Sequence, residues 1–208
     1  MHDIKLLWHS RFYYLRTIAT TTIFLALIAF IQQTKIELSL VWLLWCWNLL
    51  NSGARFWEDE QRDNAWLHWL DNCTAINIIN QKFIIHVIFN AVIWLITWMF
   101  WLLFIDYNQN MLWLALLIMA TTPIIMGVAV LISSLSASII SNSNLLSFIT
   151  LPLLVPIMVY GSGACVKLEL GQDPSHIIAG MSALAMCVGM AIPRLVLLLI
   201  REVIKLEL

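Results

Sequence analysis

The chain has 208 residues, of which 62% are hydrophobic and only 11% are charged. A soluble globular domain has about half apolar and a quarter charged residues, so one water-soluble core cannot bury this much apolar surface and we expect an integral membrane protein. Eleven Lys and Arg against twelve Asp and Glu give a formal net charge of -1, which offers no basic excess for binding nucleic acid.

The first sixteen residues predict a helix that lies along the membrane surface instead of crossing it. Ile4, Leu7, Trp8, Phe12 and Leu15 recur at helical spacing, and charged residues separate them. Residues 1–16 are therefore expected to form an interfacial helix.

Charge-free stretches predict six membrane spans, because a helix needs roughly 20 apolar residues to cross the hydrocarbon core. No charged residue occurs between positions 107 and 166, a run long enough for two helices, which the polar cluster at 141–144 divides. The sequence thus predicts an all-α membrane protein with one transmembrane domain, 1–208, whose spans are 17–34, 38–54, 83–105, 112–138, 145–162 and 176–200.

The orientation of these spans is predicted by the positions of the basic residues, since cytoplasmic loops carry an excess of Lys and Arg. An even number of spans puts both termini on one side, and nine of the eleven basic residues fall on that side. These nine are Lys5, Arg11, Arg16, Arg55, Arg62, Lys82, Arg194, Arg201 and Lys205. Both termini and the loop at 55–82 are therefore predicted to be cytoplasmic, or on the equivalent side of a mitochondrial membrane.

The loop at 55–82 holds the chain's one concentration of charge. Within it a short helix is predicted from Asn64, a competent N-cap, and its apolar stripe consists of Trp66, Trp69, Leu70, Cys73 and Ile76. Such a helix can rest its apolar face on the bundle and present the other face to a soluble partner. An ordinary solvated loop is the alternative that composition alone favours.

Three stretches resemble the family of cytochrome c maturation protein B, also called haem exporter protein B. Residues 56–63 are similar to its Phe-x-x-Asp-x-x-x-Asp, although Asn64–Leu67 stand where the family has Gly, Ser or Thr, Leu and Glu. Lys82 and His86 match a Lys-x-x-x-His spacing, and Thr122–Pro123 adds a weaker point. The closest match is the Leu-Pro-Leu-x-x-Pro pattern of Leu151, Pro152, Leu153 and Pro156.

This resemblance implies the fold of type-2 exporter permeases of the ATP-binding-cassette (ABC) class and a role in haem delivery for c-type cytochrome biogenesis. The loop at 55–82 then contains the coupling helix, and the implied partner-coupling residues are Phe56, Asp59, Arg62, Asp63 and Trp66. The implied partners are an ATPase subunit, haem-handling membrane subunits and a second permease copy, in a bacterial inner membrane. Two alternatives are a permease for a lipid or polysaccharide and an assembly scaffold without a conduit.

No catalytic or metal site is predicted. The sequence lacks a GxxxxGK[ST] nucleotide motif, an HExxH zinc motif and a GxSxG nucleophile motif, so we expect a transport subunit whose ATPase is another chain. The four cysteines form no CxxC pair. His86 and His176 are weak candidates for haem ligands, and a position at the interface or inside the bundle is the preferred interpretation of each.

The Pro and Gly residues of the fifth span suggest an interrupted helix. Pro152 and Pro156 each remove a backbone hydrogen bond, and Gly161 and Gly163 follow them. The outer end of this span is therefore expected to be broken or re-entrant.

Overall fold

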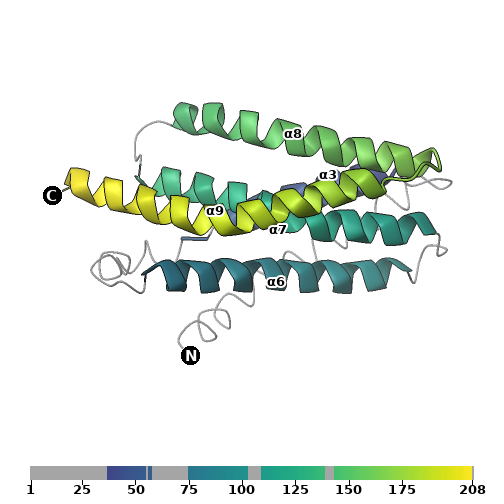
Figure 1. The fold of residues 1–208 in the computed structure, drawn as a ribbon, viewed down its shortest axis with the longest axis horizontal. Coiled ribbons are helices and arrows are strands. Elements are labelled where there is room, and N and C mark those ends of the chain that lie inside the picture. Colours follow the sequence, from purple (N-terminus) through teal and green to yellow (C-terminus); the bar gives the residue numbers. More distant parts are fainter. Residues whose placement is uncertain (1–36, 55, 58–74, 103–108, 139–142, 208) are drawn as a thin grey trace.

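The computed structural model describes residues 37–54, 56–57, 75–102, 109–138 and 143–207. This part of the chain forms five helices and no strand: α3 (Leu38–Ala54), α6 (Ala75–Leu102), α7 (Gln109–Ser138), α8 (Ser143–Glu169) and α9 (Ser175–Glu207). The helices lie nearly along one common axis (Figure 1). The predicted interfacial helix 1–16, the span 17–34 and residues 58–74 of the loop lie outside the described residues.

Helix α7 is the centre of the described bundle, and α3, α6, α8 and α9 all pack against it (Figure 1). Buried residues make up 61% of its most apolar stretch, against 28% for α6 and 22% for α9. Gly127 of α7 lets α9 approach closely, since a Cβ atom there would collide with Val188 and Ile192. The four outer helices of the described bundle are therefore positioned by their packing against α7.

Helices α3 and α7 run in the same direction and are closely packed. Trp45, in the middle of α3, donates a hydrogen bond to Thr122 of α7, and Trp57, just after the end of α3, donates one to Ser134. Both pairs have a sequence separation of 77. Between these contacts, Gly53 lies against Ala129, and a Cβ atom at position 53 would meet both its side chain and its backbone. Only glycine allows so close an approach of the two backbones.

The helix bounds agree with the predicted spans at some ends and differ at others. Helix α3 occupies the predicted range 38–54. Helix α6 begins at Ala75, whereas the sequence started the third span at 83, after Lys82. Lys82 is accommodated within the helix, because its ammonium group lies near aromatic rings. Helix α9 continues past the predicted end at 200 to Glu207.

The expectation that the fifth span is broken near its outer end is wrong. Helix α8 runs without a break through Pro152, Pro156, Gly161 and Gly163. A proline removes a single donor from the helix, and packing of α8 against α3 and α7 offsets that loss. The helix ends later, at Glu169, and Gly171 just beyond it has a φ of 70°. There the Gln172 and Gly171 N–H groups donate to the carbonyls of Lys167 and Leu168, which is a Schellman cap.

Three described helices contain stretches long and apolar enough to cross a membrane: Ile76–Met99, Asn110–Leu135 and Ser175–Leu199. Large apolar side chains are exposed along the outer faces of two of them, including Ile88 and Met99 of α6 and Met186 and Met190 of α9. Such faces suit contact with lipid tails or other membrane helices. The arrangement of six spans goes beyond these three stretches and remains a prediction.

Candidate functional site

The first two described residues of the polar loop, Phe56 and Trp57, are buried aromatic residues. Directly after α3, the chain turns and the Phe56 N–H donates to the Gly53 carbonyl at 3.0 Å. The rings of Phe56 and Trp57 then pack edge to face, with centroids 4.8 Å apart. Each ring is only 1% exposed. The start of the loop is therefore fixed to the bundle by apolar packing.

The first part of α6 completes this contact. The Lys82 Nζ atom lies 4.8 Å from the centroid of the Phe56 ring and 5.2 Å from that of Trp57, within the range of cation–π attraction. The His86 ring lies 5.0 Å from the Phe56 ring. We call Phe56, Trp57, Lys82 and His86 the loop-base cluster. It brings together residues 56–57 and residues 82 and 86, from two stretches of the sequence resemblance, which are at least 25 residues apart.

The loop-base cluster is connected to α7 by one buried hydrogen bond. The Trp57 indole Nε1 donates to the Ser134 hydroxyl oxygen at 2.7 Å. The Ser134 hydroxyl in turn donates to the Val130 carbonyl of its own helix at 2.7 Å, which leaves its oxygen free to accept from the indole. The turn after α3 thus contacts α6 through ring packing and α7 through a hydrogen bond.

A second buried polar contact lies deeper in the bundle. Asn90 of α6 donates through Nδ2 to the Ser52 hydroxyl of α3 at 3.2 Å and to the His86 carbonyl at 2.9 Å. Asn90 is 2% exposed and Ser52 is 3% exposed. In an apolar environment, interhelical hydrogen bonds of this kind fix how helices sit against one another.

The predicted partner-coupling residues divide into one that the structure describes and four that it does not. Phe56 is buried in the loop-base cluster, so its ring supports the loop from within. Asp59, Arg62, Asp63 and Trp66 lie outside the described residues. So does most of the short helix predicted from Asn64, but Ile76, the last residue of its predicted apolar stripe, belongs to α6. Their contact with a partner stays a prediction.

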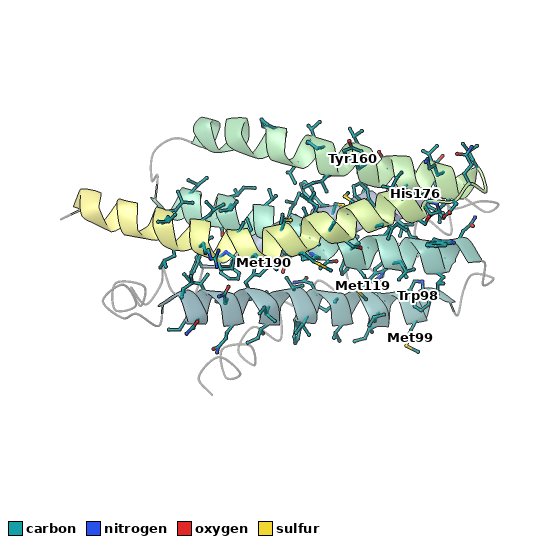
Figure 2. All side chains as sticks on the ribbon, in the orientation of Figure 1. Trp98, Met99, Met119, Tyr160, His176 and Met190 are labelled. Carbon is teal, nitrogen blue, oxygen red and sulfur yellow. The ribbon has the colours of Figure 1, made fainter. Side chains whose placement is uncertain are left out.

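The two candidate haem-ligating histidines are not brought together. His86 packs on Phe56, just beyond one end of α3. His176 is exposed in the first turn of α9, at the opposite end of the bundle (Figure 2). Among the described residues, no group of three His, Cys, Asp or Glu side chains could hold a metal ion. One haem iron cannot be ligated by both histidines in this arrangement.

The predicted span-five motif lies within the unbroken part of α8. Leu151, Pro152, Leu153 and Pro156 are all helical, and Pro152 and Pro156 are both exposed. Two prolines four residues apart fall on the same side of a helix. This exposed side is available to lipid or to another subunit.

Hydrogen bonds connect neighbouring helices at the end of the bundle where His176 lies. The Leu38 N–H at the start of α3 donates to Glu169 Oε1 at 2.7 Å, and Asn110 Nδ2 of α7 donates to the Leu168 carbonyl at 3.0 Å. Asp173 caps α9 by accepting from the Ser175 N–H at 2.9 Å and contacting its hydroxyl at 2.8 Å. These Ser175 contacts, first the backbone and then the side chain, lower the pKa of Asp173, and His176 and Lys167 add a smaller effect.

Sequence reasoning missed Ser134, Ser52 and Asn90. Each is a polar residue within an otherwise apolar helix, and this is the signal that could have identified them, because a polar side chain at that depth needs a partner. The identity of the partner could not be read in advance. The partners are 77 and 38 residues away in the sequence.

The chain was compared with known proteins. Among known families, it matches the one described as "CcmB protein", over residues 17–198. No curated protein matches it significantly. The CcmB family is part of an ABC transporter system of cytochrome c maturation. Membership in this family suggests a haem-export permease component. With nearly all of its length matched and three helices able to cross a membrane, the chain is a membrane protein that belongs to the CcmB family.

Proposed function

We propose that this chain is the permease subunit of an ABC transporter that acts in haem delivery for c-type cytochrome biogenesis. The observation that supports this most is the loop-base cluster. It joins the charged loop to α6 and α7 within a chain whose family is part of such a transporter. A loop fixed in this way can pass on a force applied to it, whereas a loose loop would absorb it.

The chain serves as the moving part and another chain supplies the ATPase. It has no nucleotide-binding motif. In our proposal six spans place both termini and the loop in the cytoplasm. A coupling helix in the loop docks the ATPase through Asp59, Arg62 and Asp63, with Trp66 on its apolar side. Two copies of the permease assemble with two ATPase subunits, and haem-handling subunits bind alongside.

The packing of the described helices favours a haem path at an interface with another subunit. Gly53 against Ala129, Gly127 against α9 and Gly161 against Trp42 are contacts too close to admit even one added methyl group. A haem cannot pass between helices packed at this distance. A path between two copies, or none at all, fits this packing better than a conduit through these helices.

Deletion of the gene tests the assignment. We expect c-type cytochromes to lose their covalently bound haem while b-type haem proteins remain, because only the c-type proteins need this delivery route. Haem staining of denatured proteins separates the two classes, and expression of the intact chain should restore the c-type signal. Normal c-type cytochromes in the deletion strain would refute this role and promote the permease for another substrate.

Charge reversal in the loop tests the ATPase contact. Asp59→Lys combined with Asp63→Lys should weaken co-purification of the ATPase, since charge complementarity across such an interface would be inverted. The matched control is Asp106→Lys, which changes the same charge in the loop predicted on the other side. Wild type, the double variant and the control should all be inserted in the membrane. Equal ATPase recovery with the three proteins would contradict the assignment of Asp59 and Asp63 as docking residues.

A further inference from the structure

Two similar hydrogen bonds join the neighbourhood of α3 to α7. The Trp45 indole donates to the Thr122 hydroxyl at 3.3 Å, and the Trp57 indole donates to the Ser134 hydroxyl at 2.7 Å. Both are buried, and each acceptor hydroxyl donates to the carbonyl four residues before it, at 2.7 Å. The two bonds have the same chemistry and the same geometry on α7. They differ in what the tryptophan is attached to.

Trp45 lies within α3, whereas Trp57 lies in the turn that begins the charged loop. Trp57 is therefore the last described residue before the predicted coupling helix. Its ring is also held by Phe56 and by the Lys82 ammonium of α6. A displacement of the loop that reaches its start acts on this ring and its contacts.

On the other side of the bond, Ser134 belongs to the helix that all other described helices contact. Close to the bond, the backbone of α3 at Gly53 lies directly against Ala129 of α7. The two backbones are packed too closely there to move independently. A displacement of Trp57 therefore displaces α7 as well. From α7 it can reach α8 and α9.

We propose that the Trp57–Ser134 hydrogen bond is the contact through which movement of the coupling loop reaches α7, so that Trp57 and Ser134 are positioning residues for the transport step. This inference rests on the proposed function in one respect, namely that an ATPase moves the loop. It does not depend on which substrate is transported.

The test uses the membrane complex purified with its ATPase. Spin labels at Met99 of α6 and Leu116 of α7, both exposed and both far along their helices from the bond, report the distance between the two helices. Figure 2 shows Met99 pointing away from the bundle. The distance is measured without nucleotide and with bound ATP. The variants are Trp57→Phe, Ser134→Ala, their combination, and Ser134→Thr, which keeps the hydroxyl.

The matched controls are Trp45→Phe and Thr122→Ala, because each removes the same kind of buried bond to α7, but one made from within α3 and not from the start of the loop. We expect Trp57→Phe and Ser134→Ala to abolish or greatly reduce the ATP-dependent change in distance, and the combination to add nothing further. The yield of matured c-type cytochrome per ATP hydrolysed should fall by roughly two- to tenfold, the effect expected from one hydrogen bond. Ser134→Thr and both controls should keep the wild-type response.

A purely structural role is separated by two further measurements. Thermal unfolding in detergent should show similar losses for Trp57→Phe and Trp45→Phe, and ATPase recovery should be unchanged in both. Equal loss of the ATP response in the Trp45 and Trp57 variants, or a full response in Trp57→Phe, would overturn the proposal. If the deletion strain keeps its c-type cytochromes, the haem role fails, and the spin-label distances still decide the link.

Discussion

Gly161 of α8 lies against Trp42 of α3. A Cβ atom there would overlap the Trp42 indole, which is completely buried and cannot move aside. We expect Gly161→Ala to destabilise the protein by about 1–3 kcal/mol, the usual cost of adding a methyl group to a packed core. Thermal unfolding in a fixed detergent measures this.

Gly163, two residues further along the same helix, is the control. No atom would lie within 4 Å of an added Cβ atom, so Gly163→Ala should be neutral or stabilising by up to about 1 kcal/mol through the better helix propensity of alanine. Equal behaviour of the two variants would show that α8 does not pack on Trp42 as described.

Asp173 predicts a pH dependence at the start of α9. Its pKa is lowered mainly by the Ser175 N–H, and a carboxyl group with a depressed pKa in the folded state stabilises that state above its ordinary pKa. The contribution is therefore complete at neutral pH and is lost only as the pH falls below the usual carboxyl range. The unfolding midpoints of wild type and Asp173→Ala should differ at pH 7, and the difference should shrink as the pH falls below the usual carboxyl range of about 4. Asp173→Asn cannot titrate at this position, so the difference between the Asp173→Asn and Asp173→Ala midpoints should not change with pH, whereas the difference between each variant and wild type should.

At the scale of helices, Asn90 supplies a buried polar contact that helps to position α6 against α3. Most of its outward face is exposed, and Asn90 is its buried hydrogen-bonding residue toward α3. Asn90→Ala should lower stability by roughly 1 kcal/mol, near the average for interhelical hydrogen bonds in membranes, and leave the Ser52 hydroxyl without this donor.

Asn77, exposed on the same helix, provides the comparison for Asn90. Asn77→Ala removes the same side chain from a position without buried contacts, so its unfolding midpoint should match wild type. A loss as large as that of Asn90→Ala would mean that the asparagine matters for the helix itself and not for the contact with α3.

The sequence predicted most helices, because the length of an apolar stretch is a local property. It placed α3 at its observed bounds and located α7, α8 and α9 within a few residues at most ends. It failed where a non-local contact decides. Lys82 was taken as a boundary, yet ring faces from the turn after α3 accommodate it within α6. Proline and glycine suggested a break in α8, yet packing against neighbouring helices keeps it continuous.

The candidate site was predictable in its members and not in its arrangement. Phe56, Lys82 and His86 stood out in the sequence, but nothing local indicates that they touch each other. The polarity of Ser134 indicates that it needs a partner, but several serines lie in this part of α7, and only the packing shows that the Trp57 indole bonds to this one. Hydrogen bonds between helices are set by the register of packing, which the sequence pattern alone does not fix.

At the scale of the whole molecule, the direction of each helix makes the predicted orientation testable. Helices α3 and α7 run in the same direction, so the loop-base cluster lies at one end of the bundle and the α8–α9 turn at the other. The basic residues predict that the first end is cytoplasmic. We therefore expect a cysteine at Gln61 to be protected from a membrane-impermeant thiol reagent added outside, and one at Gln172 to react.

Gln172 is chosen for the outer probe because it is exposed, whereas the positive φ of neighbouring Gly171 disfavours any side chain. The native cysteines are first replaced, with alanine at the buried Cys46 and Cys165 to avoid leaving a polar group in the core. Permeabilising the membrane should make Gln61→Cys react as well, which shows that the thiol is available. Labelling of position 61 from outside, with position 172 protected, would reverse the orientation. It would also place the loop-base cluster on the side of the membrane where no ATP is supplied, so that neither the ATPase contact nor the Trp57–Ser134 link could work as proposed.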